Sequence, residues 1–378
     1  MTDLLDGLGG YVLPFLIILT VLVFVHEFGH YAVARWNKVR VEVFSIGFGP
    51  ELFGFTDRAG TRWKFSAIPL GGYVRMFGDR NVASLPDGTE REYTEAERAV
   101  AFTHKRLGQR AAIVAAGPIV NFIFGAVLFA GLFVFVGQPF TSPEVGDVQP
   151  DSAAAAAGLR AGDMIVEING SRIDRFEDIR QVVQLGLGEP LSIVVLRGGD
   201  QLTLSAVPDV VEQKDSLGNS YKIGLLGVQS IGLGYEKRDP ASALWYGTEA
   251  VWTQVNVAFK AIGQMIGGAR DTSEIGGPLR IAWLSGEMAQ GGIIVALNFM
   301  AILSVHLGLI NLFPVPLLDG GHLLFYAAEA LRGKPLGERA QEYGFRIGLA
   351  LVLLLFVFAT WNDLVQLRVV QFVQELVT

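Results

Sequence analysis

Four long apolar runs divide the chain, and most charged residues lie between them. The runs cover residues 11–33, 111–136, 293–313 and 347–361. A helix needs about 20 predominantly apolar residues to cross a bilayer, so each run predicts one membrane-spanning helix. The fourth run is shorter than this and has to include neighbouring residues on either side. The pattern therefore predicts a polytopic α-helical membrane protein with about four transmembrane helices.

The segment between the first two runs has a different pattern. Within residues 41–77, three short β-type runs (VEVFSI, RWKFSAI and YVRMF) are separated by glycine and proline, which is typical of a hairpin-like sheet. The segment is too apolar for an ordinary loop, so we expect a membrane-associated β-hairpin region. Backbone of this kind persists in a bilayer when it is buried in protein or lines a wet cavity. Residues 79–98 are polar and predict an exposed loop.

Residues 141–230 have the pattern of one compact, inserted α+β domain. Runs of alternating apolar residues predict strands at 164–168, 191–196 and 202–207. A short helix that ends at Gly158 is predicted within 153–163, and an amphipathic helix at 176–186. We expect this domain to lie outside the bilayer.

Two further stretches, 242–268 and 364–376, are candidates for helices on the membrane surface. Together these elements predict four parts of the chain. The parts are an N-terminal membrane region (1–140), the inserted domain (141–230), a linker with a surface helix (231–292) and a C-terminal membrane region (293–378).

Composition narrows the possible functions. The chain is 51% hydrophobic and its mean hydropathy is +0.41, which suits a polytopic membrane protein better than a soluble enzyme. It has no cysteine, which excludes a disulfide framework and a cysteine-based zinc site. No segment is strongly basic, so a nucleic-acid partner is not expected.

The distribution of charge predicts the topology. Basic residues are concentrated in the loops that follow the first and third spans, and the positive-inside rule places both loops in the cytoplasm. The acidic 137–240 segment and both termini then face the extracytoplasmic side. The sequence Ala32-Val33-Ala34 is similar to a signal-peptide cleavage site, but the preceding segment has no basic residue, so we expect it to be retained.

Two histidines and a glutamate stand within the first apolar run, in the sequence His26-Glu27-Phe28-Gly29-His30. Ionisable groups inside a span are costly and are usually functional. His26 and His30 are four residues apart, so they share one face of a helix and can bind one Zn²⁺. Glu27 can accept a proton from water and pass it to a leaving amine. The motif predicts a zinc hydrolase that works inside the bilayer.

A catalytic zinc needs a third protein ligand and an open position. The leading candidate is Asp319, in a segment (NLFPVPLLDGG, 311–321) whose two prolines break the third span. His306 and His322 on the same element stay open as alternative ligands. Asn311 is expected to lie in the cavity, where its amide can hydrogen-bond an unwound substrate.

Five motifs occur in series along the chain. They are HEFGH (26–30), FSIGFGP (44–50), PLGGYVRM (69–76), GPIVNF (117–122) and NLFPVPLLDGG (311–321). In this order they resemble the bacterial site-2 intramembrane zinc metalloproteases, and within that family the regulator-of-sigma-E type. The resemblance covers nearly the whole chain.

The resemblance implies a set of site residues. It implies that His26, His30 and Asp319 bind zinc and that Glu27 is the catalytic base. It assigns substrate binding to Asn311, Pro314, Pro316 and Asn121. It also implies that the domain at 141–230 is PDZ-like, with GLRAGD (158–163) as its turn. The regulator-of-sigma-E type carries two tandem PDZ domains, whereas this chain has room for one.

The resemblance further implies substrates and partners. Such proteases cut transmembrane segments of single-span proteins such as anti-sigma factors, and some clear remnant signal peptides. A site-1-type protease first trims the same substrate, in regulated intramembrane proteolysis at the bacterial inner membrane. Two other classes stay open: a membrane PDZ scaffold that does not cut, which would need no zinc, and a transporter, which the absence of repeated halves disfavours.

Overall fold

The computed structural model describes residues 2–79, 93–214, 220–232, 234–268 and 270–366. They form two compact units. The first comprises 1–129, 246–255 and 277–361, and the second comprises 130–245, 256–276 and 362–378. These units do not follow the four parts that the sequence predicts, and that division stays a prediction.

Four helices in the described part of the chain are long and apolar enough to cross a membrane. They are α1 (Thr2–Trp36), α3 (Leu107–Phe135), α8 (Ile293–Asn311) and α10 (Glu338–Gln366). Each of the four predicted spans coincides with one of these helices, and α10 extends beyond the short fourth run at both ends. Of the predicted surface helix at 364–376, only the first three residues lie in the described part, inside α10.

Glycines let the helices of the first unit pack at backbone contact. A Cβ atom added at Gly29 of α1 would lie 2.5 Å from the carbonyl oxygen of Ala116 in α3, and one added at Gly125 of α3 would lie 2.9 Å from Val305 of α8. Membrane helices associate through such small residues because lipid offers no hydrophobic driving force between them. The close contacts bring the polar residues of neighbouring helices together.

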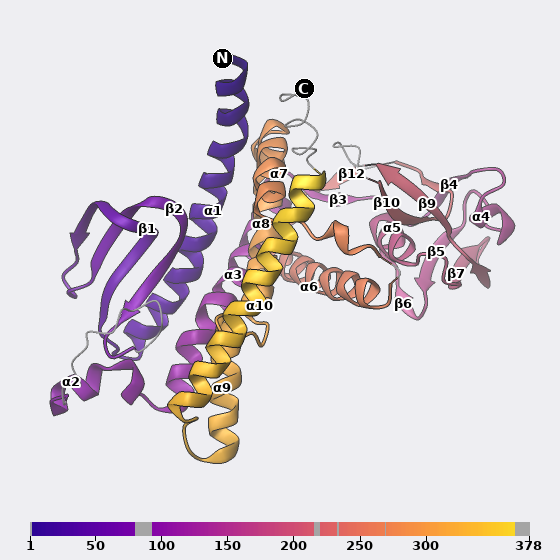
Figure 1. Cartoon of the computed structure of the whole chain (residues 1–378). Coiled ribbons are helices and arrows are strands. Elements are labelled where there is room, and N and C mark those ends of the chain that lie inside the picture. Colours follow the sequence, from indigo (N-terminus) through magenta and orange to yellow (C-terminus); the bar gives the residue numbers. More distant parts are fainter. Residues whose placement is uncertain (1, 80–92, 215–219, 233, 269, 367–378) are drawn as a thin grey trace. The chain divides into compact units, whose positions relative to one another are not determined.

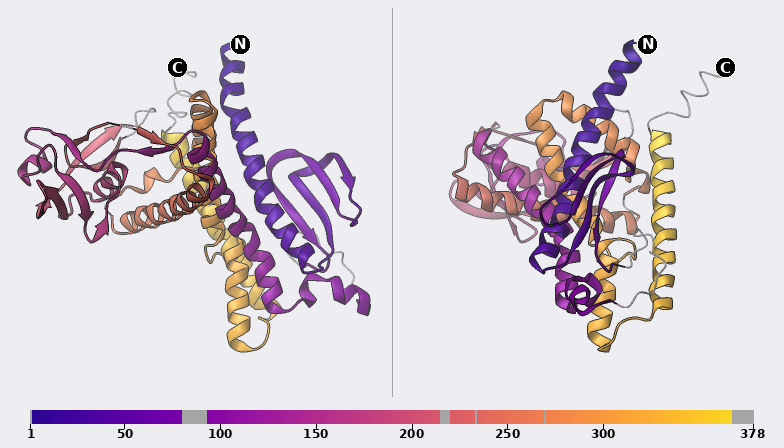
Figure 2. Two further views of the ribbon diagram at one scale, coloured as in Figure 1. Left: turned by 180° about the vertical axis from the view of Figure 1, so that it is seen from behind. Right: turned by 90° about the vertical axis from the view of Figure 1, so that its left-hand side faces the viewer.

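Two long strands lie beside α1 (Figures 1 and 2). β1 (Val41–Thr56) and β2 (Arg62–Met76) pair antiparallel, and the register places residues 43–46 between 62–65 and 72–75, with Met76 opposite Val41. Segment 72–76 therefore forms one edge of the sheet. Asp57, in the turn between the strands, accepts hydrogen bonds from Tyr31 of α1 and Trp63 of β2. The location of this sheet relative to a membrane stays a prediction.

Shorter helices connect the spans of the first unit. α2 (Glu95–Val100) begins at Thr94 with a capping box, and a 3₁₀ turn (Phe102–His104) follows it. Residues 80–92 of the predicted exposed loop lie outside the described residues. α7 (Pro278–Gln290) packs Gly286 against Tyr11 of α1, and α9 (Asp319–Arg332) ends at Gly333. The sequence had not predicted α7 or α9.

The second unit contains the inserted domain. Its four-stranded sheet has the order β6-β5-β7-β8, and its other strand pairs are β9-β10, β4-β11 and β3-β12. The strands are β3 (Gln138–Phe140), β4 (Val145–Val148), β5 (Met164–Ile168), β6 (Ser171–Arg172), β7 (Leu191–Arg197), β8 (Asp200–Ala206), β9 (Asp209–Lys214), β10 (Ser220–Leu225), β11 (Val228–Ser230) and β12 (Gly234–Glu236). The helices are α4 (Ala153–Ala156) and α5 (Phe176–Leu185). The three predicted strands correspond to β5, β7 and β8, and the two predicted helices to α4 and α5.

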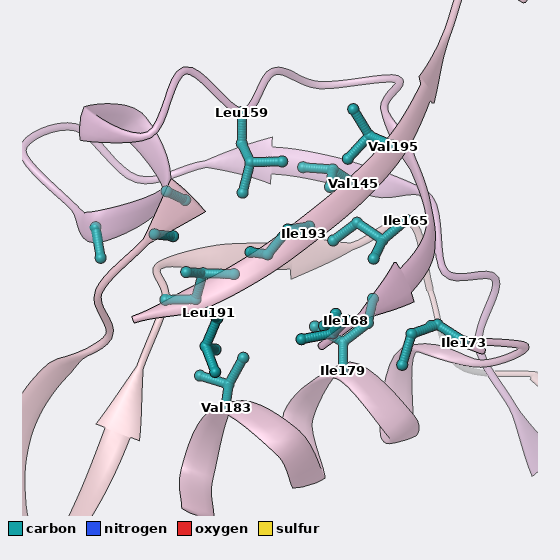
Figure 3. Packing of buried hydrophobic residues seen from close by; sticks show 14 of the residues in the cluster. Val145, Leu159, Ile165, Ile168, Ile173, Ile179, Val183, Leu191, Ile193 and Val195 are labelled. Atoms are coloured by element: carbon teal, nitrogen blue, oxygen red, sulfur yellow. The ribbon is translucent and has the colours of Figure 1, made fainter. Parts of the chain in front are cut away.

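An aliphatic core holds this domain together. Figure 3 shows α5 beneath β5 and β7, with Ile179 and Val183 of the helix directed at Ile168 and Leu191 of the strands. These side chains are buried together with Val145, Leu159, Ile165, Ile173, Ile193 and Val195. After the domain, α6 (Pro240–Ile266) forms the helix predicted at 242–268, with Asp239 as its N-cap.

Candidate metal centre

The two histidines of the first span lie on one face of α1, one turn apart. Their Nε2 atoms are 3.2 Å apart. His26 is 9% exposed and His30 is 8% exposed, so both imidazoles are removed from the surface. The four-residue spacing predicts this arrangement because a helix makes one turn in 3.6 residues.

Asp319, at the first turn of α9, reaches the same point. Its Oδ2 atom lies 3.2 Å from Nε2 of His26 and 3.5 Å from Nε2 of His30. Zinc–ligand bonds of about 2.0–2.1 Å at tetrahedral angles place neighbouring donor atoms about 3.3 Å apart. This buried Oδ2 has no hydrogen-bond partner among the described residues. The three atoms therefore fit three corners of a zinc coordination tetrahedron.

The connection between α8 and α9 positions Asp319. α8 ends at Asn311, seven residues of turns and bends follow, and α9 starts at Asp319 itself. Leu317 has a φ of 149°, a region that non-glycine residues rarely adopt. Strained backbone of this kind persists where the surrounding structure enforces it, most often at functional sites.

Glycines let that connection fold back tightly. A Cβ atom at Gly320 would meet the carbonyl oxygens of Leu312 and Phe313, and one at Gly348 of α10 would meet the carbonyl oxygen of Pro316. The start of α9 and the middle of α10 therefore both contact the backbone of this connection. This packing keeps Asp319 at the level of the histidines.

α3 makes room for the imidazoles. A Cβ atom at Gly117 would meet Nε2 of His30 and would lie 2.6 Å from Cε1 of His30 and 2.8 Å from Cε1 of His26. Only a residue without a side chain fits at this position. Gly117 had been noted in the sequence only as part of a motif, because nothing in its neighbours indicates which side chains face it.

The outer nitrogen of each imidazole also has a partner. Nδ1 of His30 lies 2.9 Å from the backbone oxygen of Ile113. Nδ1 of His26 lies 3.1 Å from Nδ2 of Asn121. Metal-binding histidines are usually oriented by such partners. The Ile113 contact escaped the sequence analysis because a backbone carbonyl leaves no trace in the residue type.

The side chain of Glu27 extends from α1 towards the edge of the β1–β2 sheet. The backbone of Val74 is within hydrogen-bonding reach of its carboxylate, which also interacts electrostatically with His30, His26 and Asp319. A Cβ atom at Gly72 would lie 3.3 Å from Cγ of Glu27. The carboxylate therefore lies between the candidate metal-binding atoms and the edge segment 72–76.

The residues predicted to bind substrate differ in how far they are buried. Asn311 at the end of α8 and Pro316 are half-buried, whereas Pro314 is exposed. Asn121 is fully buried. Their assignment to substrate binding stays a prediction. The alternative ligands His306 and His322 lie outside the group of metal-binding atoms in the described residues, and the His322 ring instead packs against Phe345.

Known proteins are similar to this chain over almost its whole length. Residues 14–355 match peptidase family M50. A protein of Agrobacterium fabrum described as a "putative zinc metalloprotease" is 47% identical over 94% of this chain and 96% of its own length. The metalloprotease MmpA of Caulobacter vibrioides is 38% identical over 96% of this chain and 97% of its own length.

Solved structures match a smaller part. The PDZ domain of an SdrC-like protein from Listeria monocytogenes matches 24% of this chain and 90% of that chain, with 20% identity and a TM-score of 0.20.

The family match and the whole-length relatives agree with the geometry of the metal centre. Two histidines, a glutamate and a distant aspartate meet among apolar helices, and the histidine and aspartate donor atoms are spaced as zinc requires. The chain belongs to peptidase family M50, the site-2 type of zinc metalloprotease.

Proposed function

We propose that this protein is an intramembrane zinc endopeptidase that cleaves transmembrane segments of single-span membrane proteins. In this proposal His26, His30 and Asp319 hold the zinc ion, and Glu27 is the general base. The observation that carries it is the spacing of the three donor atoms, 3.2 to 3.5 Å, on helices that the sequence marks as membrane-spanning or adjacent to a span.

In this proposal the zinc ion and Glu27 have different roles in hydrolysis. Zinc bound here supplies Lewis-acid chemistry, which acidifies water and polarises the carbonyl of the scissile bond. Glu27 accepts the proton that the attacking water loses and donates it to the nitrogen of the departing amine. The edge segment beside Glu27 keeps the carboxylate close to the metal-binding atoms, and the surrounding apolar helices limit the access of bulk water.

A helical substrate has to be unwound before this chemistry, because its amides are already hydrogen-bonded. Segment 72–76 is a sheet edge, and the backbone of Val74 in this segment is within hydrogen-bonding reach of Glu27. An extended substrate strand can add to such an edge and exchange its helical hydrogen bonds for sheet hydrogen bonds. We propose that Asn311, Pro314 and Pro316 hold the same strand from the α8–α9 connection.

The substrates and the topology are also part of this proposal. The motifs favour anti-sigma factors and remnant signal peptides as substrates, cut after a site-1-type protease has acted. The charge pattern favours a multi-pass inner-membrane protein with the inserted domain and both termini on the extracytoplasmic side. The inserted domain is proposed to be a PDZ-like module.

Cleavage of a purified single-span substrate by the purified protein tests the proposal. Glu27→Gln should lower the cleavage rate about 10²–10⁴-fold while zinc stays bound, and a chelator should abolish cleavage by the wild type. Glu189→Gln, in an exposed loop of the inserted domain, is the matched control and should cleave normally. Full activity of Glu27→Gln would refute the assigned base, and wild type free of zinc would point to a scaffold.

A further inference from the structure

At the metal centre, the side-chain amide of Asn121 is oriented so that it cannot accept a hydrogen bond from His26. A histidine that binds zinc through Nε2 carries its proton on Nδ1, so Nδ1 has to donate. His30 meets this requirement because its Nδ1 faces the carbonyl oxygen of Ile113 at 2.9 Å, and a carbonyl can only accept. Nδ1 of His26 instead faces Nδ2 of Asn121 at 3.1 Å, and that nitrogen is itself a donor.

The other end of the same amide is also unsatisfied. Oδ1 of Asn121 is buried and has no hydrogen-bond partner among the described residues. The oxygen and nitrogen of an asparagine amide have nearly the same shape, so their assignment follows from the hydrogen-bond network. Rotation of the amide by about 180° places the oxygen opposite Nδ1 of His26 and removes the clash of two donors.

We propose that Asn121 is the positioning residue of the first zinc ligand: its Oδ1 accepts the Nδ1–H bond of His26. This bond fixes the tautomer in which Nε2 has the free lone pair that a zinc ion shared with His30 and Asp319 would accept. The inference rests on the zinc site proposed above. It replaces the substrate contact that the sequence suggested for Asn121, because this side chain has no exposed surface through which a substrate could touch it.

The surroundings of Asn121 suit this role. Ser304 of α8 donates to the backbone oxygen of Asn121 at 2.8 Å, and the missing side chain of Gly308 leaves room beside its Cβ atom. Gly117 stands one turn earlier on α3 and faces both imidazoles. One face of α3 therefore supplies the space for the ligands and, one turn later, the acceptor that orients one of them.

Zinc affinity, measured by competition with a chromophoric chelator on the full-length protein, tests the proposal. Asn121→Leu keeps the approximate volume but has no acceptor, and its affinity should fall about 10–100-fold. Asn121→Asp keeps an acceptor and should bind zinc within a few-fold of the wild type. Asn362→Leu, a buried asparagine of α10 that bonds to the backbone at Thr272, is the matched control and should bind zinc normally.

The outcomes separate this inference from the proposed function. Wild-type affinity in Asn121→Leu, or equal losses in the leucine and aspartate variants, would overturn the positioning role. Failure of the wild type to bind zinc would instead overturn the zinc site itself.

A second measurement uses only the wild-type protein. In the zinc-loaded wild type with ¹⁵N-labelled histidine, two imidazoles should show a protonated Nδ1 and a coordinated Nε2. A ring coordinated through Nδ1 would contradict the proposal.

Discussion

The metal centre and the inserted domain are stabilised in opposite ways. At the metal centre, glycines bring backbones into contact, and three polar side chains are buried: His26, His30 and Asn121. The inserted domain buries fifteen hydrophobic residues in one cluster and gains its stability from their removal from water. The comparison shows that close fit and hydrogen bonding determine the structure of the metal centre, whereas buried apolar area determines the stability of the inserted domain. A substitution that adds a methyl group should therefore disrupt the metal centre. A substitution that removes buried methyl groups should instead destabilise the inserted domain.

The largest effect is expected from Gly117→Ala. The added methyl group would overlap the imidazole of His30 and crowd that of His26. Misplacement of a ligand by about 1 Å can cost about 10²-fold in rate, so cleavage should fall by at least this factor, with loss of zinc. Zinc content and substrate cleavage measure the effect.

Gly131→Ala in the same helix is the control for this change. A Cβ atom at Gly131 has no neighbour within 4 Å, so this variant should keep its zinc and its activity. Wild-type zinc binding by Gly117→Ala would show that α3 does not limit the space for the ligands.

The second prediction concerns the inserted domain, where the removal of buried methyl groups should lower stability. Ile193 of β7 has no exposed surface, and Ile193→Ala should lower the free energy of unfolding of the domain by about 2–5 kcal/mol. Hydrogen exchange of the domain in the full-length protein reports this loss, while zinc affinity should stay unchanged. Val207→Ala, at a half-exposed position, should change exchange little. Loss of zinc from Ile193→Ala would contradict the independence of the two regions.

The smallest of the three effects concerns an ion pair of the inserted domain. Arg197 donates two hydrogen bonds of 2.7 Å to Asp163, whose side chain is 1% exposed. These bonds lower the pKa of Asp163 below its ordinary value. The pair therefore stabilises the domain above the unfolded-state pKa of about 3.9. This contribution disappears as the pH falls through the lower pKa of the folded state.

Asp163→Asn isolates that contribution. The variant should lose about 1.5–3 kcal/mol of domain stability at neutral pH and should lose less than the wild type on acidification to pH 3. Pulse proteolysis in urea, with pepsin at acid pH, measures both quantities. An unchanged pH dependence in Asp163→Asn would show that other carboxylates govern the acid sensitivity.

The sequence predicted those features that leave a mark in residue type or periodicity. The apolar runs marked all four spans, and the spacing of His26 and His30 placed both imidazoles on one helix face. Alternation of apolar residues marked β5, β7 and β8 of the inserted domain. Asp319 was the leading third ligand because it stood out as an acid in an apolar, proline-broken segment.

Features that depend on tertiary contact were not predicted. The Asp-Gly-Gly sequence at 319–321 is typical of a loop, yet it starts α9, because glycines there permit backbone contacts that no local rule anticipates. α7 was missed because its sequence is too polar for a span and its packing partner is Tyr11, far away in the chain. The acceptor at Ile113 is a main-chain atom, which no residue type reveals.

The proposed zinc ligands lie far apart along the chain, His26 and His30 on α1 and Asp319 at the start of α9. Ribosomes add about 5–20 residues per second, so tens of seconds separate the synthesis of the histidines from that of the aspartate. During this interval the nascent chain can insert its first two spans without a complete hydrolytic centre. The order of the proposed ligands thus leaves the hydrolytic centre incomplete until α9 has been made.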